Sequence, residues 1–224
     1  MKPISPTSST MWDWLMEAIF PSHCVGCGIL GTFLCDTCIK AIPPAEPHAE
    51  NYIRAVWSYR HNAVRHLIWY LKYDGVYAIA PLCARAIGDS AIEDLAERSL
   101  TKNSTPVMVI ATPIGPKRLK ERGYNQAELI AASLVKYVMP GMLVHLPGAL
   151  TKTHDTTPQM SFPDKRTRLT NLKGLFVVTC PEAIRDNDII LIDDVVTTGA
   201  TLGEARRVLL EAGARSVHAY VVAH

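Results

Sequence analysis

The stretch 188–202, DIILIDDVVTTGATL, gathers acids and hydroxyl groups beside a turn that could hold an anion. A run of apolar residues typical of a buried strand ends in Asp193 and Asp194, and the small residues 197–201 lead into a helix-like pattern. Backbone N–H groups at the start of a helix are unpaired, and the helix dipole attracts anions there. Gly199 permits a positive φ and a close approach of the backbone to a ligand. The turn therefore predicts a phosphate site.

The two acids need a separate explanation, because a carboxylate placed near a phosphate repels it. Successive residues of a strand face opposite sides, so Asp193 and Asp194 can converge on one ligand only where the strand is ending. Carboxylates accept hydrogen bonds from hydroxyl groups and also bind Mg²⁺. A sugar phosphate with vicinal hydroxyls would satisfy both the acids and the turn. The stretch has neither the G-K-[ST] of a nucleotide P-loop nor a G-x-G-x-x-G, and an ordinary capped helix after a strand is the alternative interpretation.

Four of the six cysteines lie close together near the N-terminus, in CVGC and CDTC. Two residues between cysteines let a tight turn place both sulfurs on one ion, and two such pairs complete the closed four-cysteine geometry of structural zinc. Two disulfides or reduced core cysteines are the alternatives, and a cytoplasmic setting disfavours disulfides. His23 and His48 are nearby, but four cysteines already fill the shell, while Cys83 and Cys180 lie in apolar patterns and are expected to be buried. The predicted zinc ligands are Cys24, Cys27, Cys35 and Cys38.

The elements that must position these groups alternate between strands and helices. Helical spacing of apolar residues predicts helices, and short apolar runs predict buried strands. Such alternation is typical of an α/β fold with a mostly parallel sheet. The segment 151–173 has no clear periodicity, and long loops of this kind are often active-site lids. The expected strands are 53–59, 107–111, 142–146, 174–178, 188–192 and 216–222, and the expected helices are 62–73, 79–100, 125–139 and 200–212.

Composition and charge narrow the class of protein. The 224 residues are 48% hydrophobic and 20% charged, as expected for a folded chain, and the net charge of +2 predicts no polyanionic partner by bulk charge alone. No apolar run reaches the roughly 18 residues of a transmembrane helix. Acids at 13 and 17 interrupt the segment 11–20, which favours an amphipathic helix over a signal peptide, so a cytoplasmic protein is expected. The proline-rich stretch AIPPAEPHAEN indicates a linker between an N-terminal module, 1–46, and a main domain, 47–224.

Several stretches resemble a known family. LIDDVVTTGATL is similar to the signature with which type I phosphoribosyltransferases bind phosphoribosyl pyrophosphate (PRPP). Nearly the whole chain after residue 20 resembles the ComF/GntX family, in which a four-cysteine finger precedes a phosphoribosyltransferase domain; LKYDG, RLKERGYNQAELIA and RLTNLKGLF match it further. The resemblance implies a type I phosphoribosyltransferase-like parallel sheet flanked by helices, with a small zinc-ribbon module at the N-terminus.

The resemblance also assigns roles to the acids and the turn. Asp193 and Asp194 would hold the ribose 2′- and 3′-hydroxyls, and the turn would hold the 5′-phosphate. Mg²⁺ would bridge the pyrophosphate and the ribose hydroxyls, held mostly by substrate oxygens and water. The PRPP-binding residues implied here are Asp193, Asp194, Val195, Val196, Thr197, Thr198, Gly199, Ala200 and Thr201.

Transfer from PRPP breaks the bond between ribose C1 and pyrophosphate, with an oxocarbenium-like transition state by analogy with glycoside cleavage. Cations should therefore surround the departing pyrophosphate. The segment 113–125, PIGPKRLKERGYN, follows an expected strand as the pyrophosphate loop of this fold does, and a lid would close from 152–172. Plain surface charge is the alternative interpretation of these basic residues. The expected catalytic residues are Asp193, Asp194, Lys72 and Arg122, and further PRPP contacts are expected from Lys117, Arg118, Lys152 and Arg168.

Three functions are compatible with these residues. The first is Mg²⁺-dependent transfer of the phosphoribosyl group to an acceptor that the sequence does not identify, in nucleotide-linked metabolism or DNA uptake. The second, suggested by the role of ComF relatives in natural competence, is PRPP-responsive binding of single-stranded DNA, with a competence helicase-type protein as a further partner. The third is a regulator that binds PRPP without chemistry; the oligomeric state stays open. Aromatic residues that could stack bases, although their helical spacing also fits a core, are Trp57, Tyr59, Trp69, Tyr70 and Tyr73.

Overall fold

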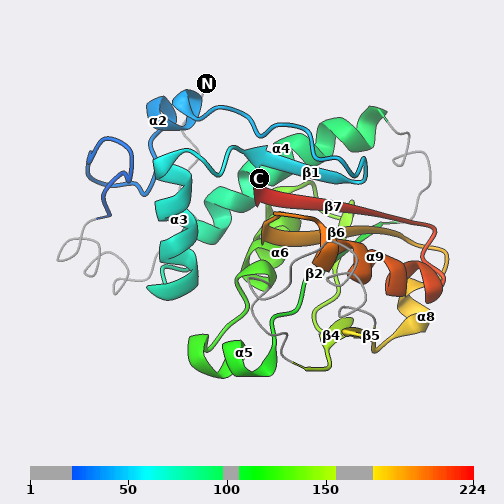
Figure 1. Ribbon diagram of the computed structural model, residues 1–224. Coiled ribbons are helices and arrows are strands. Elements are labelled where there is room, and N and C mark those ends of the chain that lie inside the picture. The colour runs from blue at the N-terminus through cyan, green and yellow to red at the C-terminus, as the bar shows by residue number, and fades with distance from the viewer. Residues whose placement is uncertain (1–21, 98–105, 155–173) are drawn as a thin grey trace.

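One parallel sheet forms the centre of the molecule. The computed structural model describes residues 22–97, 106–154 and 174–224. The strands of the sheet are β1 (Ile53–Trp57), β2 (Val107–Ala111), β3 (Leu143–His145), β6 (Asp188–Val195) and β7 (Ser216–Ala223). They lie in the order β1-β7-β6-β2-β3, and each neighbouring pair is parallel (Figure 1). The predicted mostly parallel α/β fold is therefore confirmed.

Helices cover both faces of this sheet. The long helices are α3 (Asn62–Tyr73), α4 (Ile79–Glu97), α6 (Gln126–Tyr137) and α9 (Ala200–Glu211). Ile190 and Ile192 of β6 pack in one core with α3, α4 and α6, whereas Ile189 and Leu191 pack in a second core with α9. Side chains of a strand alternate between its faces, and both faces here are covered, which explains the unbroken apolar run in the sequence.

A second, smaller sheet lies outside the parallel one. Strands β4 (Leu150–Lys152) and β5 (Phe176–Val178) pair antiparallel. β5 was expected as a strand, but within the described ranges it pairs with β4 instead of joining the parallel sheet. β4 was not expected, because a three-residue strand has no readable alternation. The two strands flank the predicted lid, of which residues 155–172 lie outside the described residues.

Among the described residues, three short helices were not predicted from the sequence: α2 (Asp36–Ala41), α5 (Pro116–Arg122) and α8 (Pro181–Ile184). Each is too short for an apolar periodicity to be read. α5 matters most, because it occupies much of the segment expected as a pyrophosphate loop. It begins with a proline, whose fixed φ suits the first helical position, and ends at Gly123 in a left-handed conformation with φ 81°. In the three described ranges, no helix is long and apolar enough to cross a membrane.

The cysteine-bearing segment joins the main domain along the outer edge of β1. Pro44 forms an antiparallel bridge with Trp57, and the N–H of Ala45 donates to the carbonyl of Val56 at 3.1 Å. Leu34, from between the two cysteine pairs, packs in the same buried core as α3. The segment is thus anchored to the sheet, while the domain boundary at residue 46 stays a prediction.

Candidate functional site

The turn between β6 and α9, residues 196–199, places backbone donors beyond the carboxyl end of β6. Gly199 precedes α9 with φ 73°, a left-handed conformation that a side chain would strain. Gly199 is the N-cap residue of α9 and has no side chain that could accept a hydrogen bond from the first N–H groups of the helix. The N–H of Ala200 makes only a long hydrogen bond, of 3.5 Å, to the hydroxyl of Thr198. The start of α9 is therefore weakly capped and can accept an anion. Thr197 and Thr198 are exposed, and their hydroxyls can donate further hydrogen bonds to it.

Asp193 and Asp194 lie on opposite faces of the sheet. β6 continues to Val195, so the expectation that the strand ends at the acids is wrong. Because side chains alternate, Asp193 shares the α9 face with Leu191, and Asp194 shares the face of α3 and α6 with Ile192. Asp194 is 3% exposed, whereas Asp193 is half-buried as a whole residue and its carboxyl group is withdrawn from water. The two carboxylates therefore have different surroundings and can carry different tasks.

Asp194 is held by two side chains from separate helices. Its Oδ2 lies 2.9 Å from the ammonium of Lys72 on α3 and accepts a hydrogen bond of 2.9 Å from Nε2 of Gln126 on α6. Burial of the ammonium acts to lower the pKa of Lys72, but the charge and hydrogen bond of Asp194 outweigh it, and the pKa is raised above its usual value. A paired, hydrogen-bonded carboxylate is the form in which a buried charge is tolerated.

Asp193 is the more unusual of the two acids. Burial, reinforced by the neighbouring charge of Asp194, raises the pKa of Asp193 to about 7. Its Oδ1 accepts the backbone N–H of Asp194 at 2.8 Å, which partly opposes that rise. A carboxyl group that titrates near neutrality can accept a hydroxyl hydrogen bond when ionised and donate one when protonated.

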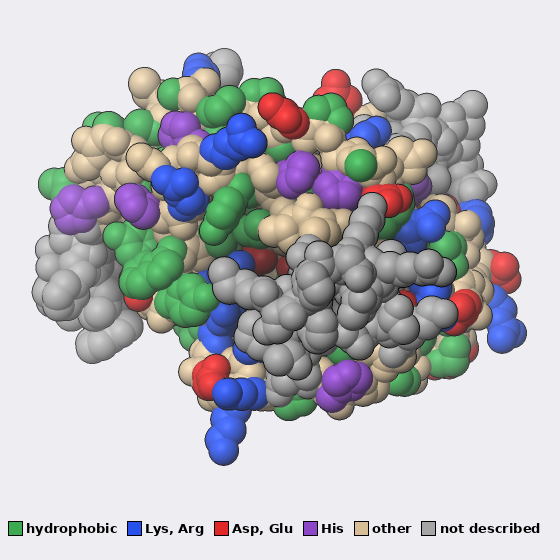
Figure 2. Space-filling model, viewed as in Figure 1, with side chains coloured by type: hydrophobic (Ala, Val, Ile, Leu, Met, Phe, Trp, Pro, Cys, Tyr) green, Lys and Arg blue, Asp and Glu red, His purple; other side chains and the backbone are tan. Residues whose placement is uncertain are grey.

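Arg122, at the end of α5, is connected to the same network. Its guanidinium donates to Oε1 of Gln126, whose amide nitrogen donates to Asp194. The guanidinium also lies 5.3 Å from the ring centre of Tyr73, which is an exposed residue on α3. Figure 2 shows acidic and basic side chains close together in a hollow of the molecular surface, with hydrophobic side chains beside the hollow. The structure thus brings together three of the four expected catalytic residues, Lys72, Arg122 and Asp194.

Two further polar residues, Gln126 and Thr112, were not among the predicted site residues, although Gln126 lies in the stretch RLKERGYNQAELIA that resembles the family. Gln126 directly follows Asn125, whose side chain caps α6 by accepting the N–H of Ala127 at 3.1 Å. The signal in the sequence that could have indicated Gln126 is its position at the start of a helix that follows a strand. Thr112 follows β2 and donates its N–H to the carbonyl of Ile192 at 2.8 Å, which puts it beside Asp193. Among the described residues, its buried hydroxyl has no hydrogen-bond partner. A buried, unpaired hydroxyl beside an acid is a candidate ligand group.

The sequence model of the Phosphoribosyl transferase domain matches residues 129–224, which include β6, the turn and α9. This chain contains a phosphoribosyltransferase domain. The DNA utilization protein YhgH of Shigella flexneri is 29% identical over 200 residues, 88% of this chain and 82% of that protein. Competence protein ComFC of Streptococcus pneumoniae is 26% identical over 171 residues, 75% and 66%. Together with the cysteine cluster described below, these relatives confirm the resemblance to the ComF family.

Solved structures are similar at a greater distance. A hypoxanthine phosphoribosyl transferase from Trypanosoma cruzi has 10% sequence identity and a TM-score of 0.40. The likeness covers 63% of this chain and 63% of that one.

The remaining basic residues expected around the phosphoribosyltransferase site are more scattered. Lys117 and Arg118 are exposed on α5, and the ammonium of Lys117 lies 3.9 Å from Glu121 on the same helix. Lys152 ends β4 and is half-buried. Arg168 lies outside the described residues. Their expected PRPP contacts therefore stay predictions, whereas Lys72 and Arg122 already belong to the network around Asp194.

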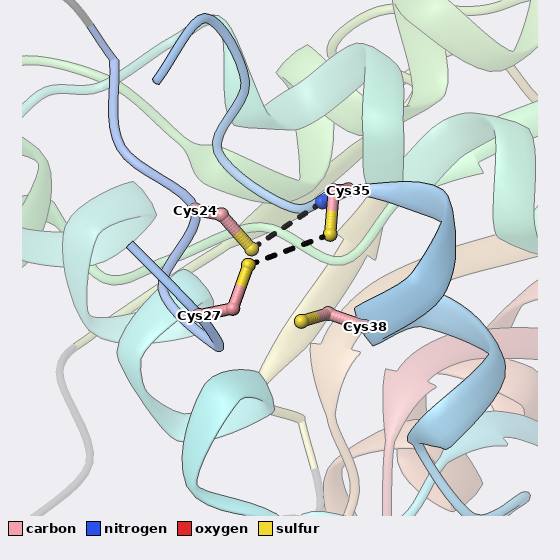
Figure 3. A group of neighbouring side chains, drawn as sticks. All are labelled: Cys24, Cys27, Cys35 and Cys38. Atoms are coloured by element: carbon pink, nitrogen blue, oxygen red, sulfur yellow. Dashed lines mark hydrogen bonds between the residues drawn. The ribbon is translucent and has the colours of Figure 1, made fainter. Parts of the chain in front are cut away.

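The four N-terminal cysteines form one compact cluster. Their sulfurs lie within 4.8 Å of one another and point toward a common centre (Figure 3). Cys24 and Cys27 come from a turn, while Cys35 and Cys38 lie at the start of α2. Zn–S bonds of about 2.3 Å in a tetrahedron separate sulfurs by about 3.8 Å, and the sulfurs of Cys27 and Cys35 are 3.7 Å apart. The donor set and its spacing could hold one metal ion and match the spacing of a four-cysteine zinc site.

Local details of the cluster also suit a metal. Burial of the Cys24 thiol opposes its ionisation, but N–H groups of Cys35, Cys27 and Gly26 outweigh it and lower the pKa of Cys24 to about 6. A Cβ on Gly26 would lie 2.7 Å from the sulfur of Cys38, so only glycine fits there. Of the two other cysteines, Cys83 is buried as expected, whereas Cys180 is half-buried, contrary to expectation.

Proposed function

We propose that this protein binds PRPP where β6 ends and, with Mg²⁺, transfers its phosphoribosyl group to an acceptor. The observation that carries the proposal is the glycine at the start of α9, a helix start without a side-chain N-cap one short turn after Asp193 and Asp194. The backbone and threonines of the turn hold the 5′-phosphate, and Asp193 accepts the ribose hydroxyl hydrogen bonds. A match to the phosphoribosyltransferase domain across this stretch supports the assignment.

The basic residues act on the leaving group. As the bond from ribose C1 to pyrophosphate breaks, its electron pair leaves with the pyrophosphate, and positive charge grows on the ribose. Lys72 and Arg122 stabilise the negative charge on the departing pyrophosphate, and Lys117 and Arg118 contribute from α5. Mg²⁺ bound together with PRPP would supply neutralisation of the phosphate charge. Because Lys72 is paired with Asp194, substrate binding and this ion pair compete for the same ammonium.

Calorimetric titration of PRPP with Mg²⁺ tests the binding step. Asp193→Asn should weaken the affinity at least tenfold, since an amide replaces the ionised acceptor of two hydroxyls. Asp186→Asn is the matched control, because Asp186 is exposed and its φ of 59° suits asparagine equally well. Failure of the wild-type protein to bind PRPP would sink the proposal. A pyrophosphate-release screen over bases and oligonucleotides then separates an enzyme from a regulator that binds PRPP without chemistry.

A second candidate function, binding of single-stranded DNA, has its own observation. Trp69 and Tyr73 on α3, which could have been core residues, are 51% and 65% exposed, and their ring centres lie 5.9 Å apart. Arg122 lies over Tyr73, and aromatic rings beside a guanidinium are a platform on which bases stack. Trp57, by contrast, is buried at 6% exposure and belongs to the core. The names of the relatives, DNA utilization protein and competence protein, point the same way.

Fluorescence titration with an oligothymidylate over a salt series tests the DNA proposal. Trp69→Ala should weaken binding roughly tenfold by loss of a stacked base, and affinity should fall steeply with salt. Tyr137→Ala on α6 is a suitable control, because Tyr137 is also exposed but pairs with Asp89 on α4. An affinity that does not respond to salt or to Trp69 would leave the enzymatic function alone. A helicase-type competence protein is proposed as a further partner on the strength of the family resemblance.

A further inference from the structure

The linker that follows the cysteine module lies along the first turns of α9. A Cβ on Gly199 would meet the ring of His48, and a Cβ on Gly203, one turn later, would lie 3.3 Å from the hydroxyl of Tyr52. The guanidinium of Arg206 lies 4.6 Å from the ring centre of Tyr52. Two glycines spaced by four residues, at the N-cap and in the first turn of α9, thus lie against the side chains of His48 and Tyr52. The linker is therefore a neighbour of the phosphate turn, although more than 140 residues of chain separate the two.

His48 presents a defined edge of its ring to that turn. A Cβ on Gly199 would lie 2.8 Å from Cε1 and 3.3 Å from Nε2 of His48. The other ring nitrogen, Nδ1, faces the backbone N–H of Glu50 at 3.1 Å and accepts its hydrogen bond. In the neutral ring the proton must then sit on Nε2, the nitrogen nearer the turn. The structure therefore fixes a donor, not an acceptor, at the edge that faces the turn.

We propose that His48 is a ligand of the 5′-phosphate held by the turn, donating its Nε2–H to a phosphate oxygen. This inference rests on the proposed PRPP site and adds a residue to it from outside the matched domain, which begins at residue 129. The sequence offers His48 as a substitute metal ligand, but within the described residues the group that could hold a metal comprises the four cysteines alone. The ring of His48 lies against Gly199 of the turn instead.

The surroundings of His48 hold the ring in this position. Its ring centre lies 5.0 Å from that of His224, at an interplanar angle of 59°. His224 is itself fixed, since its backbone N–H donates to the carbonyl of Trp57 and its carbonyl accepts the N–H of Tyr59. A ring packed on one side and hydrogen-bonded at Nδ1 loses little further freedom when it binds, which favours a binding role. The cysteine module would then complete the phosphate site by positioning its linker.

Binding measurements on His48 variants test the inference. His48→Ala should weaken PRPP affinity with Mg²⁺ about tenfold, the loss expected for one hydrogen bond to a charged group. His48→Gln, which can place an amide N–H near the position of Nε2, should restore most of it. Affinity for pyrophosphate with Mg²⁺ should be unchanged in both, because that group lies at the other end of the substrate. His66→Ala is the control, since His66 is exposed on α3.

A direct readout separates contact from folding. In ¹⁵N-labelled protein, the Nε2 resonance of His48 should shift when ribose 5-phosphate is added, while that of His66 should not. If the wild-type protein and His48→Ala bind PRPP with equal affinity, this inference is overturned and the proposed function stands. Wild-type protein that binds no PRPP overturns both.

Discussion

The ammonium of Lys72 on α3 lies 2.9 Å from the carboxylate of Asp194 on β6, and both side chains are largely withdrawn from water. The pair joins the helix layer to β6, the strand that leads into the turn proposed to bind phosphate. Gln126 completes it from α6, so three elements meet at one carboxylate oxygen. The pair is therefore part of the fold as well as of the proposed site.

Removal of Lys72 should cost stability and PRPP binding together. In Lys72→Ala, Asp194 keeps only Gln126, and a buried carboxylate without its cation destabilises a protein by roughly 3 kcal/mol. Urea unfolding measures this loss, with the exposed Lys120→Ala on α5 expected to change stability by less than about 0.5 kcal/mol. Because the pKa of Lys72 is raised, its contribution is present below the ordinary lysine pKa near 10.4 and is lost as the pH rises through the higher folded value. Equal losses of stability in Lys72→Ala and Lys120→Ala would contradict a stabilising role for the buried pair of Lys72 and Asp194.

The raised pKa of Asp193 predicts that this residue changes the free energy of unfolding with pH in the opposite direction to an ordinary surface acid. Between the unfolded value near 4 and the folded value of about 7, the folded protein binds the extra proton. The free energy of unfolding should therefore fall as the pH rises through this window and level off above it. Asp193→Asn should remove that component, which a comparison of the two urea midpoints from about pH 4.5 to about pH 8 measures. Parallel curves would show that Asp193 titrates normally.

PRPP affinity should change in the same window but in the other direction. In the proposed site, the ionised form of Asp193 would accept hydrogen bonds from ribose hydroxyls, so binding should strengthen as the pH rises toward and past 7. The PRPP phosphate that titrates near pH 6 contributes as well. The difference between wild type and Asp193→Asn, measured by calorimetry, isolates the carboxylate. A difference independent of pH would assign it another role.

Loss of the metal should unfold the cysteine module and weaken the phosphate site. Purified protein should carry about one zinc per chain, since the closed four-cysteine site supplies four ligands. Cys27→Ser should lose the metal, whereas Cys180→Ser, outside the cluster, should keep it. Less than half an equivalent of zinc would refute the site. If the position of the linker depends on the cysteine module, removal of the metal by a chelator should also lower PRPP affinity, by about as much as His48→Ala does.

Much of the fold could be read from the sequence, because its signals are local. The helix α3 and the strand β2 have the predicted bounds, since their apolar spacing is clear. The cysteine cluster followed from two C-x2-C pairs. The relation of Asp194 to Gln126, by contrast, depends on how α6 packs against β6, and no spacing in the sequence encodes it. The contact of His48 with Gly199 is of the same kind: it arises from the path of a linker that reads only as proline-rich.

Gly199 gives the sharpest test of the turn, because two independent constraints exclude a side chain there. Its φ of 73° is left-handed, and a Cβ would lie 2.8 Å from Cε1 of His48. Gly199→Ala should therefore lower stability by roughly 1–2 kcal/mol from the backbone alone and reduce PRPP affinity more than tenfold. Gly203→Ala is the matched control, since Gly203 lies inside α9, where alanine is favoured by about 1 kcal/mol and its Cβ meets only the Tyr52 hydroxyl at 3.3 Å.

The double variant Gly199→Ala with His48→Ala separates the two constraints. Removal of the ring relieves the steric contact but leaves the left-handed backbone, so the double variant should regain part of the stability lost in Gly199→Ala. PRPP affinity should not recover, because both the close backbone approach and the Nε2 donor are then missing. Full recovery of binding would mean that neither the Nε2 donor of His48 nor the close backbone approach at Gly199 contributes to holding the phosphate.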